Sequence, residues 1–352
     1  MSTFSLPAPR LAGLVSILPS HVEENTALAD RFGAEAIAKI IAATGIERRP
    51  IARTETIAEL ATQAARQLLD GLGWAPETVD LVVVVTQTPD YPMPATACLM
   101  QHALGLAPHT AAFDLSLGCS GFVYALSVVA SLLTNGAARR ALLVTGDITS
   151  RLIGNDDRSL APLFGDAVSV AALDAEHGVG RMTFDLGSDG SGAPYLTCRT
   201  GGTIEPGPAR LFMDGTQVMA FSLKQVRPSI HRVMAEAGRT MAEVDHVVLH
   251  QANAMMLKTL GQKIGAAPEQ LVLAVRDYGN TSSASIPLAL TDCLGKSPRG
   301  PKRLLLSGFG VGWSWASAWW ETAAPSVCDM TRAGVGKPLA GSQPISTMRE
   351  DG

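Results

Sequence analysis

Short apolar runs alternate with helical patterns along most of this chain, and this alternation limits the fold more than any other feature. The runs carry few charges and are rich in branched apolar residues, which is typical of strands buried on both faces. They cover Leu81–Val85, Ala111–Leu115, Ala141–Thr145, Ala167–Leu173, Val247–His250, Leu271–Val275 and Leu304–Ser307. Between them, periodic apolar positions predict helices at Glu55–Leu72, Ala95–Leu104, Gly121–Leu132, Ala220–Glu236, Asn253–Ile264 and Ile286–Leu294. The alternation predicts an α/β fold built on a largely parallel sheet with helices on both faces.

Two strand segments of the first half of the chain are echoed in the second half. TVDLVVVVTQ (78–87) matches EVDHVVLHQ (243–251), and RRALLVTGD (139–147) matches PKRLLLSGF (301–309), at nearly the same offset. This indicates a duplicated βα unit with a pseudo-twofold axis, and we divide the chain into halves 1–175 and 176–322. An offset of 162 takes Cys119 to Thr281, beside Asn280, and an offset of 163 takes Gln87 to His250. The duplication therefore predicts that Cys119, His250 and Asn280 meet in one central cleft.

Composition places the chain among globular proteins. Of its 352 residues 47% are hydrophobic and 17% are charged, which excludes a disordered chain. A net charge of −4 without a long basic run argues against nucleic acid as a partner. The N-terminus lacks signal-peptide features, and the apolar segment Phe122–Leu133 is too short to span a bilayer, so we expect a soluble cytoplasmic protein. From Ala323 to Gly352 there is neither an aromatic residue nor a periodic pattern, which predicts a disordered tail.

The cysteines suggest neither a disulfide framework nor a metal site. Their number is odd and no CxxC pair occurs, and the seven histidines are scattered. The five are Cys98, Cys119, Cys198, Cys293 and Cys328. We expect reduced thiols, of which one is a candidate nucleophile.

That candidate is Cys119, in the segment FDLSLGCSGFVYALSVVASLL (113–133). The pattern predicts a strand, a turn and a helix that opens near the cysteine. A thiol at a helix start faces unpaired backbone N–H groups and the positive end of the helix dipole, and both favour the reactive thiolate. The same N–H groups can form half of an oxyanion hole. The alternative is a small buried core thiol.

Three further segments are candidates for the same site. His250 ends a predicted strand in HVVLHQANAMMLKTL (246–260), where its alternative is a purely structural histidine. Asn280 lies in YGNTSSASIPLAL (278–290), with a simple turn residue as the alternative. The glycines of SGFGVGWSWASAWW (307–320) lack the GxGxxG spacing of a dinucleotide loop and favour a tight turn that exposes backbone N–H groups.

In this order, the segments GCSG, HQAN and YGNTSSASIP resemble the Cys-His-Asn triad of the β-ketoacyl-ACP synthase III family, which has the thiolase fold. TGIERR (44–49), DRSLAPLFGDAVSV (157–170) and FGVGWSW (309–315) add to the resemblance, which runs from Gly13 to Trp320. It implies duplicated halves in a five-layered α-β-α-β-α arrangement. It also implies a homodimer that needs no cofactor or metal and works with acyl carrier protein.

The resemblance implies a two-stage reaction. Cys119 takes an acyl group from a thioester primer, with the oxyanion held by the backbone N–H groups of Cys119 and Val311. His250 and Asn280 then hold the thioester oxygen of malonyl-ACP while CO₂ leaves, and the resulting enolate attacks the acyl group. Two alternatives stay open: an acyltransferase that forms an ester or amide without decarboxylation, and a Cys-His thioester hydrolase.

The resemblance also implies residues around the triad. The expected substrate-binding residues are Met93, Arg158, Phe164, Met213, Asn253 and Phe309, and the expected carrier-protein contacts are Lys258 and Lys263. Lys39 and Ala43 stand where the family's housekeeping members hold the adenine of CoA with Trp and Arg, and Met255 replaces a basic residue. These departures favour a specialised pathway over initiation of fatty-acid synthesis, with either CoA or ACP carrying the primer.

Overall fold

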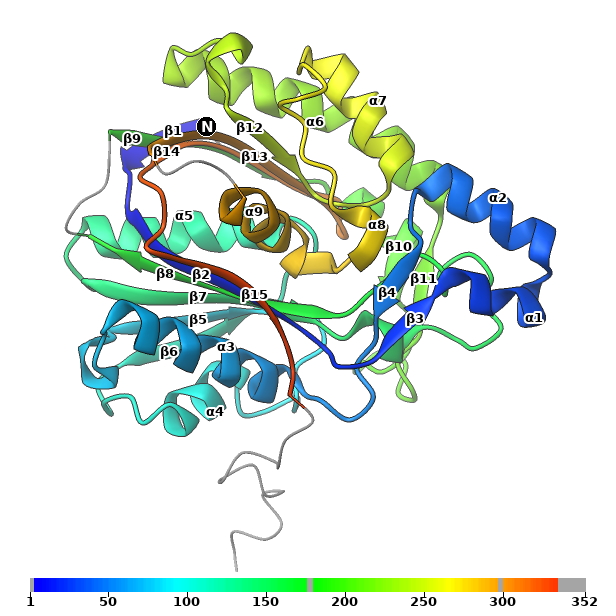
Figure 1. The fold of residues 1–352 in the computed structure, drawn as a ribbon, viewed down its shortest axis with the longest axis horizontal. Coiled ribbons are helices and arrows are strands. Elements are labelled where there is room, and N and C mark those ends of the chain that lie inside the picture. The colour runs from blue at the N-terminus through cyan, green and yellow to red at the C-terminus, as the bar shows by residue number, and fades with distance from the viewer. Residues whose placement is uncertain (1–2, 176–179, 297–299, 335–352) are drawn as a thin grey trace, which may run out of the picture.

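Three layers of helices alternate with two β-sheets in this protein (Figure 1). The structure is a computed structural model that describes residues 3–175, 180–296 and 300–334. The larger sheet has the order β15 (Val327–Arg332), β2 (Arg10–Leu18), β8 (Ala167–Asp174), β7 (Arg140–Asp147), β5 (Leu81–Val85), β6 (Ala111–Leu115). The smaller has the order β1 (Thr3–Pro7), β9 (Arg181–Ser188), β14 (Ser314–Thr322), β13 (Lys302–Gly310), β12 (His246–Leu249). Together with the helices, these sheets form the expected α-β-α-β-α sandwich.

The helices occupy the layers that their apolar faces require. Helices α5 (Gly121–Thr134) and α9 (Ser285–Gly295) lie between the two sheets and are buried over most of their length. The outer layers are α3 (Ile57–Leu72) and α4 (Thr96–Ala103) on one side, and α6 (Gly215–Ala237) and α7 (Ala254–Ile264) on the other. A helix between two sheets must be apolar nearly all round, whereas an outer helix needs only one apolar face.

The remaining elements lie beside the sandwich. Two short hairpin-like ladders pair β3 (Val22–Glu24) with β4 (Arg48–Pro50) and β10 (Leu196–Cys198) with β11 (Leu211–Met213). The short helices are α1 (Ala29–Phe32), α2 (Ala34–Thr44) and α8 (Val275–Tyr278). Among the residues the structure describes, no helix is long and apolar enough to cross a membrane.

The duplication predicted from the sequence is confirmed. In one half β5 and β7 are parallel neighbours, and in the other β12 and β13 are parallel neighbours. The buried helices that follow Cys119 and Thr281, α5 and α9, both lie in the central layer. The six predicted helices all form, with ends within about five residues of those expected.

The prediction of a largely parallel sheet is wrong. In the larger sheet β8 runs antiparallel to both of its neighbours, and in the smaller one β14 does the same. The predicted strand Leu271–Val275 also fails to form, since Leu271 makes only a single bridge to Val247 before α8 begins. Continuous apolar runs show that a strand is buried on both faces, but they do not give its direction.

The predicted tail and the proposed halves need correction at the chain ends. Val327–Arg332 form β15, which pairs in parallel with β2 and covers that edge of the larger sheet. At Gly13 a Cβ would lie 2.6 Å from Leu68 Cδ1 and 3.2 Å from the Val327 carbonyl oxygen, so glycine there leaves room for both α3 and β15. β1, near the other terminus, joins the smaller sheet. The sheets thus exchange terminal strands, so a cut at residue 175 does not separate the halves; residues 335–352 of the predicted tail lie outside the described residues.

Candidate active site

Cys119 opens onto a cavity of about 200 Å³ between the two halves of the fold. It lies in the turn between β6 and α5, one residue before the helix N-cap Ser120. Segments from both halves line the cavity, among them Phe164 from the first half and Ser282 and Val311 from the second. The duplication thus places the predicted nucleophile at a cleft to which distant segments contribute.

The end of β13 passes directly behind the cysteine. A Cβ at Gly310 would lie 3.1 Å from Cys119 Sγ, and one at Gly308 would lie 2.6 Å from the Cys119 carbonyl oxygen. The Ser120 and Ser314 hydroxyl groups are 2.6 Å apart, and the Ser314 hydroxyl donates to the Val311 carbonyl. These contacts fix the turn after β13 against the start of α5. Glycine at positions 308 and 310 therefore leaves the space into which the cysteine segment packs.

The Cys119 thiol is neutral at physiological pH. Burial, together with the nearby Asp147 carboxylate, raises its pKa to about 12, although a hydrogen bond from Ser282 works in the opposite direction. A backbone hydrogen bond at the helix start also lowers this pKa, as the sequence predicts, but the net shift is opposite to the predicted thiolate. Loss of hydration and a buried negative charge outweigh the N–H groups of α5.

His250 follows β12 directly and is almost fully buried. Its Nδ1 lies 2.7 Å from the Ser285 hydroxyl at the start of α9, and its ring meets Phe309 edge-on, with 5.5 Å between centroids. Phe309 immediately precedes Gly310, which packs against Cys119. The β13 segment that contacts His250 therefore also contacts the cysteine. Burial lowers the pKa of His250 to about 3, which leaves a neutral imidazole.

Asn280 is placed by a close crossing of two backbones. It forms a parallel bridge with Phe164, and a Cβ at Gly165 would lie only 2.1 Å from the Tyr278 carbonyl oxygen. The Asn280 Oδ1 accepts a hydrogen bond from the backbone N–H of Ser282, which has a left-handed φ of 51°. Both Phe164 and Ser282 line the Cys119 cavity, so Asn280 stands directly behind two of its walls.

Comparisons with known proteins agree with this arrangement. Models of 3-oxoacyl-[acyl-carrier-protein] synthase III match residues 113–190, and models of its C-terminal region match residues 234–322. The β-ketoacyl-[acyl-carrier-protein] synthase III of Bordetella petrii is 39% identical over 316 residues, covering 87% of this chain and 96% of that protein. The chain belongs to the β-ketoacyl-ACP synthase III family.

Solved structures of the family superpose closely. The 3-oxoacyl-(acyl-carrier protein) synthase of Burkholderia xenovorans has a TM-score of 0.89 at 36% identity, covering 94% of this chain and 99% of that one. The priming β-ketosynthase of the R1128 polyketide biosynthetic pathway has a TM-score of 0.83 at 31% identity, covering 91% and 98%. The duplicated fold described above is thus the thiolase fold of this family.

Some of the other predicted site residues line the Cys119 cavity, and others do not. Phe164 and Val311 line it, and Phe309 is buried behind it against His250. Met213 is half-buried at the end of β11 and is not among the lining residues. Asn253 caps α7, because its side-chain oxygen accepts a hydrogen bond from the Met256 N–H. That oxygen therefore already has a structural role.

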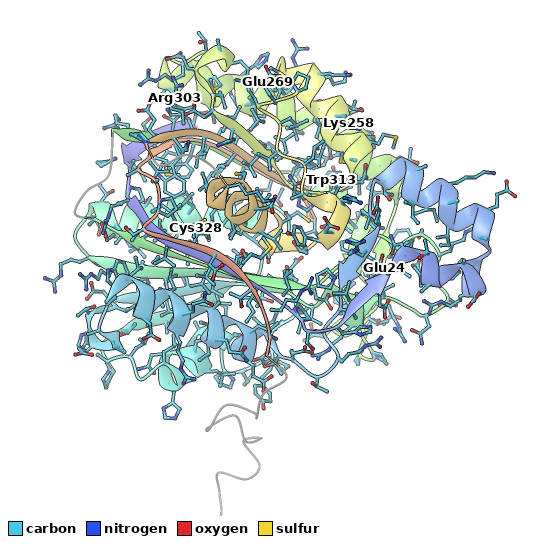
Figure 2. All side chains as sticks on the ribbon, viewed as in Figure 1. Glu24, Lys258, Glu269, Arg303, Trp313 and Cys328 are labelled. Atoms are coloured by element: carbon cyan, nitrogen blue, oxygen red, sulfur yellow. The ribbon has the colours of Figure 1, made fainter. Side chains whose placement is uncertain are left out.

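The remaining predicted contacts lie at the surface. Arg158 borders a separate cavity of about 420 Å³ with Lys39, whose ammonium group pairs with Glu35 at 2.7 Å. The Met93 side chain is 82% exposed, so it lines no pocket within its own subunit. Lys258 and Lys263 are exposed on α7, where Figure 2 shows Lys258 on the outer side of the fold.

Several residues of the site carry no signal in the sequence. Asp147 ends β7 and is almost fully buried, where it accepts hydrogen bonds from the Ser283 hydroxyl (2.6 Å) and the Gln87 N–H (2.7 Å). Burial raises its pKa. The bond between His250 and Ser285 was equally unforeseen. For Asp147 the internal repeat offered an indirect signal, because it aligns the end of β7 with the end of β13, which lies beside Cys119.

Proposed function

We propose that this chain condenses an acyl primer held on Cys119 with malonyl-ACP to form a β-ketoacyl thioester. Its family is one of condensing acyltransferases, and the observation that carries the proposal is Cys119 at the head of α5, pressed against Gly310, in a cavity built by both halves. The reaction has two stages, acylation and decarboxylative condensation. Each places a different demand on the site.

In acylation the Cys119 sulfur bonds to the acyl carbon, the bond from that carbon to the carrier sulfur breaks, and the Cys119 proton ends on the carrier thiol. The negative charge that develops on the acyl oxygen needs nearby donors. We assign this role to the backbone N–H groups of Cys119 and Val311. The assignment is supported by the contact of Gly310 with the cysteine, which keeps the turn at Val311 close to the reacting sulfur.

In condensation the carboxylate of the malonyl group leaves as CO₂, and its bonding electrons pass into an enolate. The enolate carbon bonds to the acyl carbon, the bond from that carbon to the Cys119 sulfur breaks, and the released thiolate takes up a proton from water. We assign His250 Nε2 and Asn280 Nδ2 as donors to the enolate oxygen. Among the described residues neither atom has a hydrogen-bond partner. Both side chains are buried, and their other polar atoms are already engaged by Ser285 and Ser282.

The Ser285 hydroxyl decides which histidine nitrogen carries the proton. If it donates to Nδ1, the neutral ring carries its hydrogen on Nε2 and can donate to the enolate. A ring with a pKa of about 3 remains neutral at the working pH, which suits a step that creates negative charge without taking a proton from carbon. The same reasoning makes His250 a poor base for the thiol of Cys119.

We further propose that the primer and pathway are specialised. Lys39 and its partner Glu35 occupy the cavity beside Arg158, where family members that use CoA hold its adenine, so one side of that contact is altered. The R1128 relative, by its name, primes polyketide synthesis, which supports a role outside housekeeping fatty-acid initiation. Turnover of acetyl-CoA and malonyl-ACP at the rate of a housekeeping synthase would contradict this narrower proposal.

A homodimer and a docked carrier protein complete the proposal. Among the described strands β6 is the last of the larger sheet and has no partner on its outer edge, so it can continue the sheet into a second copy. The exposed Met93 would then reach the partner's acyl cavity. Lys258 and Lys263 on α7 would receive the acidic carrier protein, and a thiol nucleophile suits the reducing cytoplasm.

The test is intact-protein mass spectrometry after incubation with panels of acyl-CoA and acyl-ACP, combined with release of CO₂ from malonyl-ACP. An acyl adduct on the wild type and none on Cys119→Ala supports the first stage. CO₂ release with a β-ketoacyl product supports the second. Adduct without CO₂ would favour ester or amide formation, free acid would favour hydrolysis, and no adduct from any thioester would refute the proposal.

A further inference from the structure

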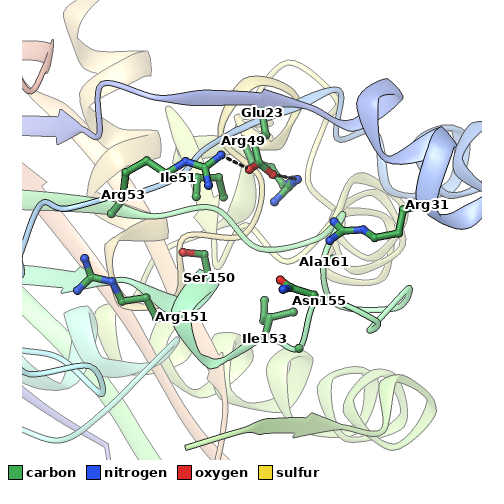
Figure 3. A pocket seen from close by; sticks show the side chains of 12 residues that line it. Glu23, Arg31, Arg49, Ile51, Arg53, Ser150, Arg151, Ile153, Asn155 and Ala161 are labelled. Atoms are coloured by element: carbon green, nitrogen blue, oxygen red, sulfur yellow. Dashed lines mark hydrogen bonds and ion pairs between the residues drawn. The ribbon is translucent and has the colours of Figure 1, made fainter. Parts of the chain in front are cut away.

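A second cavity, of about 350 Å³, lies behind the active site and is lined by arginines (Figure 3). Four guanidinium groups border it, from Arg31, Arg49, Arg53 and Arg151. Glu23 is the only carboxylate in its lining, so four positive charges face one negative charge and leave a surplus of three. No residue lines both this cavity and the Cys119 cavity.

One of the four arginines is rigidly held. The Arg49 side chain is 3% exposed and donates to Asn25 Oδ1 (2.7 Å), the Phe164 carbonyl (3.1 Å) and Glu23 Oε2 (3.2 Å). Glu23 also accepts from Arg53 at 2.9 Å. The carboxylate therefore contacts two guanidinium groups before any ligand arrives and fixes the buried Arg49, which lowers the entropic cost of binding.

The cluster carries unbalanced positive charge. Burial lowers the pKa of Arg49, whereas the carboxylates of Glu23 and of the neighbouring Asp166 raise it; the charge of Arg31 has a smaller lowering effect. Figure 3 shows Arg31 and Asn155 reaching into the space from the side opposite Arg53. Ser150 also borders the space, although its hydroxyl donates to Asp166.

We propose that this cavity binds a multivalent phosphate-type anion, such as a phosphate ester or a diphosphate. Arginine forks bind phosphate oxygens in pairs, and several converging positive charges favour a dianion over a monoanion. A single carboxylate would leave about two of the surplus charges uncompensated. The ligand class therefore follows from the number of arginines and from their planar, preorganised forks.

The cavity stands back to back with the Cys119 cleft. The 3-10 turn Thr149–Leu152 separates them: Thr149 and Leu152 line the Cys119 cavity, whereas Ser150 and Arg151 line the arginine cavity. Arg49 also bonds the carbonyl of Phe164, another wall of the cleft. An anion bound here touches the supports of the acyl cavity without entering it.

The experiment is calorimetric titration of the protein with pyrophosphate, in a low-salt buffer free of phosphate and sulfate. We expect saturable binding that weakens with added NaCl. The double variant Arg31→Gln/Arg53→Gln should bind about a hundredfold more weakly, since a charge-assisted contact contributes roughly a factor of ten. The matched control is Arg66→Gln, an exposed arginine on α3 outside the cavity, which should bind like the wild type.

Three results would overturn the proposal: no binding by the wild type at about millimolar pyrophosphate, equal binding by the double variant, or equal weakening in the control. If the double variant does not fold, the single variant Arg31→Gln, expected to bind about tenfold more weakly, replaces it. Cys119→Ala must bind pyrophosphate like the wild type, so the outcome is independent of the proposed condensation.

A competition arm identifies the source of the phosphate. If the phosphates of a CoA primer occupy the cavity, CoA displaces pyrophosphate, and the double variant raises KM for acyl-CoA but not for an acyl thioester of N-acetylcysteamine, which has no phosphate. If a free phosphorylated metabolite is the ligand, saturating CoA leaves pyrophosphate binding unchanged. Both results support the site and differ only in its natural occupant.

Discussion

Acidification should destabilise this protein through His250, and the size of the effect follows from the burial of the ring. In the folded chain the His250 pKa is lowered to about 3, whereas in the unfolded chain the ring has its ordinary pKa of 6.5. A group whose folded pKa is lowered in this way favours the unfolded state whenever it is protonated there. The contribution is therefore negligible above pH 6.5 and grows as the pH falls below it.

The expected magnitude is about 2 kcal/mol between pH 7 and pH 5. At pH 5 the unfolded ring is almost fully protonated and the folded ring is not, so the loss is about 1.4 kcal/mol for each of the 1.5 pH units below 6.5. Asp166 acts in the opposite sense, because burial raises its pKa to about 6, so it takes up a proton more readily in the folded chain. The total pH dependence thus mixes several groups.

The assay isolates His250 by a double difference. The free energy of unfolding is measured by urea denaturation at pH 7 and pH 5, at equal protein concentration, for the wild type and for His250→Gln. Asp166 and the other carboxyl groups cancel between the two proteins. The wild type should lose about 2 kcal/mol more than the variant. Equal losses, within about 0.5 kcal/mol, would refute a buried neutral imidazole.

Three further outcomes test the geometry of the site. Gly310→Ala places a Cβ 3.1 Å from Cys119 Sγ and should slow acyl-adduct formation about ten- to a hundredfold, measured by mass spectrometry, whereas Gly190→Ala, where a Cβ meets nothing within 4 Å, should not. Ser285→Ala frees the His250 tautomer and should slow CO₂ release about tenfold while adduct formation stays unchanged; slowing of both would contradict the tautomer argument. Alkylation of the Cys119 peptide by iodoacetamide should accelerate about tenfold per pH unit from pH 7 to 9, because the thiol pKa is about 12; a plateau in this range would disprove it.

Local signals predicted the elements of the fold, and the internal repeat predicted how they combine. The helix start at Ile57 shows why: Thr56 and Glu59 form a capping box within four residues, so the sequence there determines its own structure. The repeat also predicted which distant segments lie in equivalent positions, which the periodicity of single segments cannot predict. It placed α5 and α9 in equivalent positions, and with them the segments that carry Cys119 and Asn280.

The errors arose where distant segments meet. β15 contains no periodic pattern. It forms a strand because it pairs with β2, more than three hundred residues earlier in the chain. The prediction of a thiolate at Cys119 considered only the helix that follows it. Asp147, from β7, and the backbone of β13 surround the same sulfur, and neither is near it in sequence.

The corrected charge state of Cys119 strengthens the argument for condensation. The Cys119 thiol and the His250 imidazole are both neutral at rest, while the arginine surplus lies in a separate cavity behind the cleft. The enolate and the acyl oxyanion are then the negative charges that form during turnover, and buried neutral donors stabilise them more strongly than hydrated ones would. The burial that lowers the His250 pKa to about 3 keeps this side chain a neutral donor at the working pH, which is the form that the proposed condensation uses.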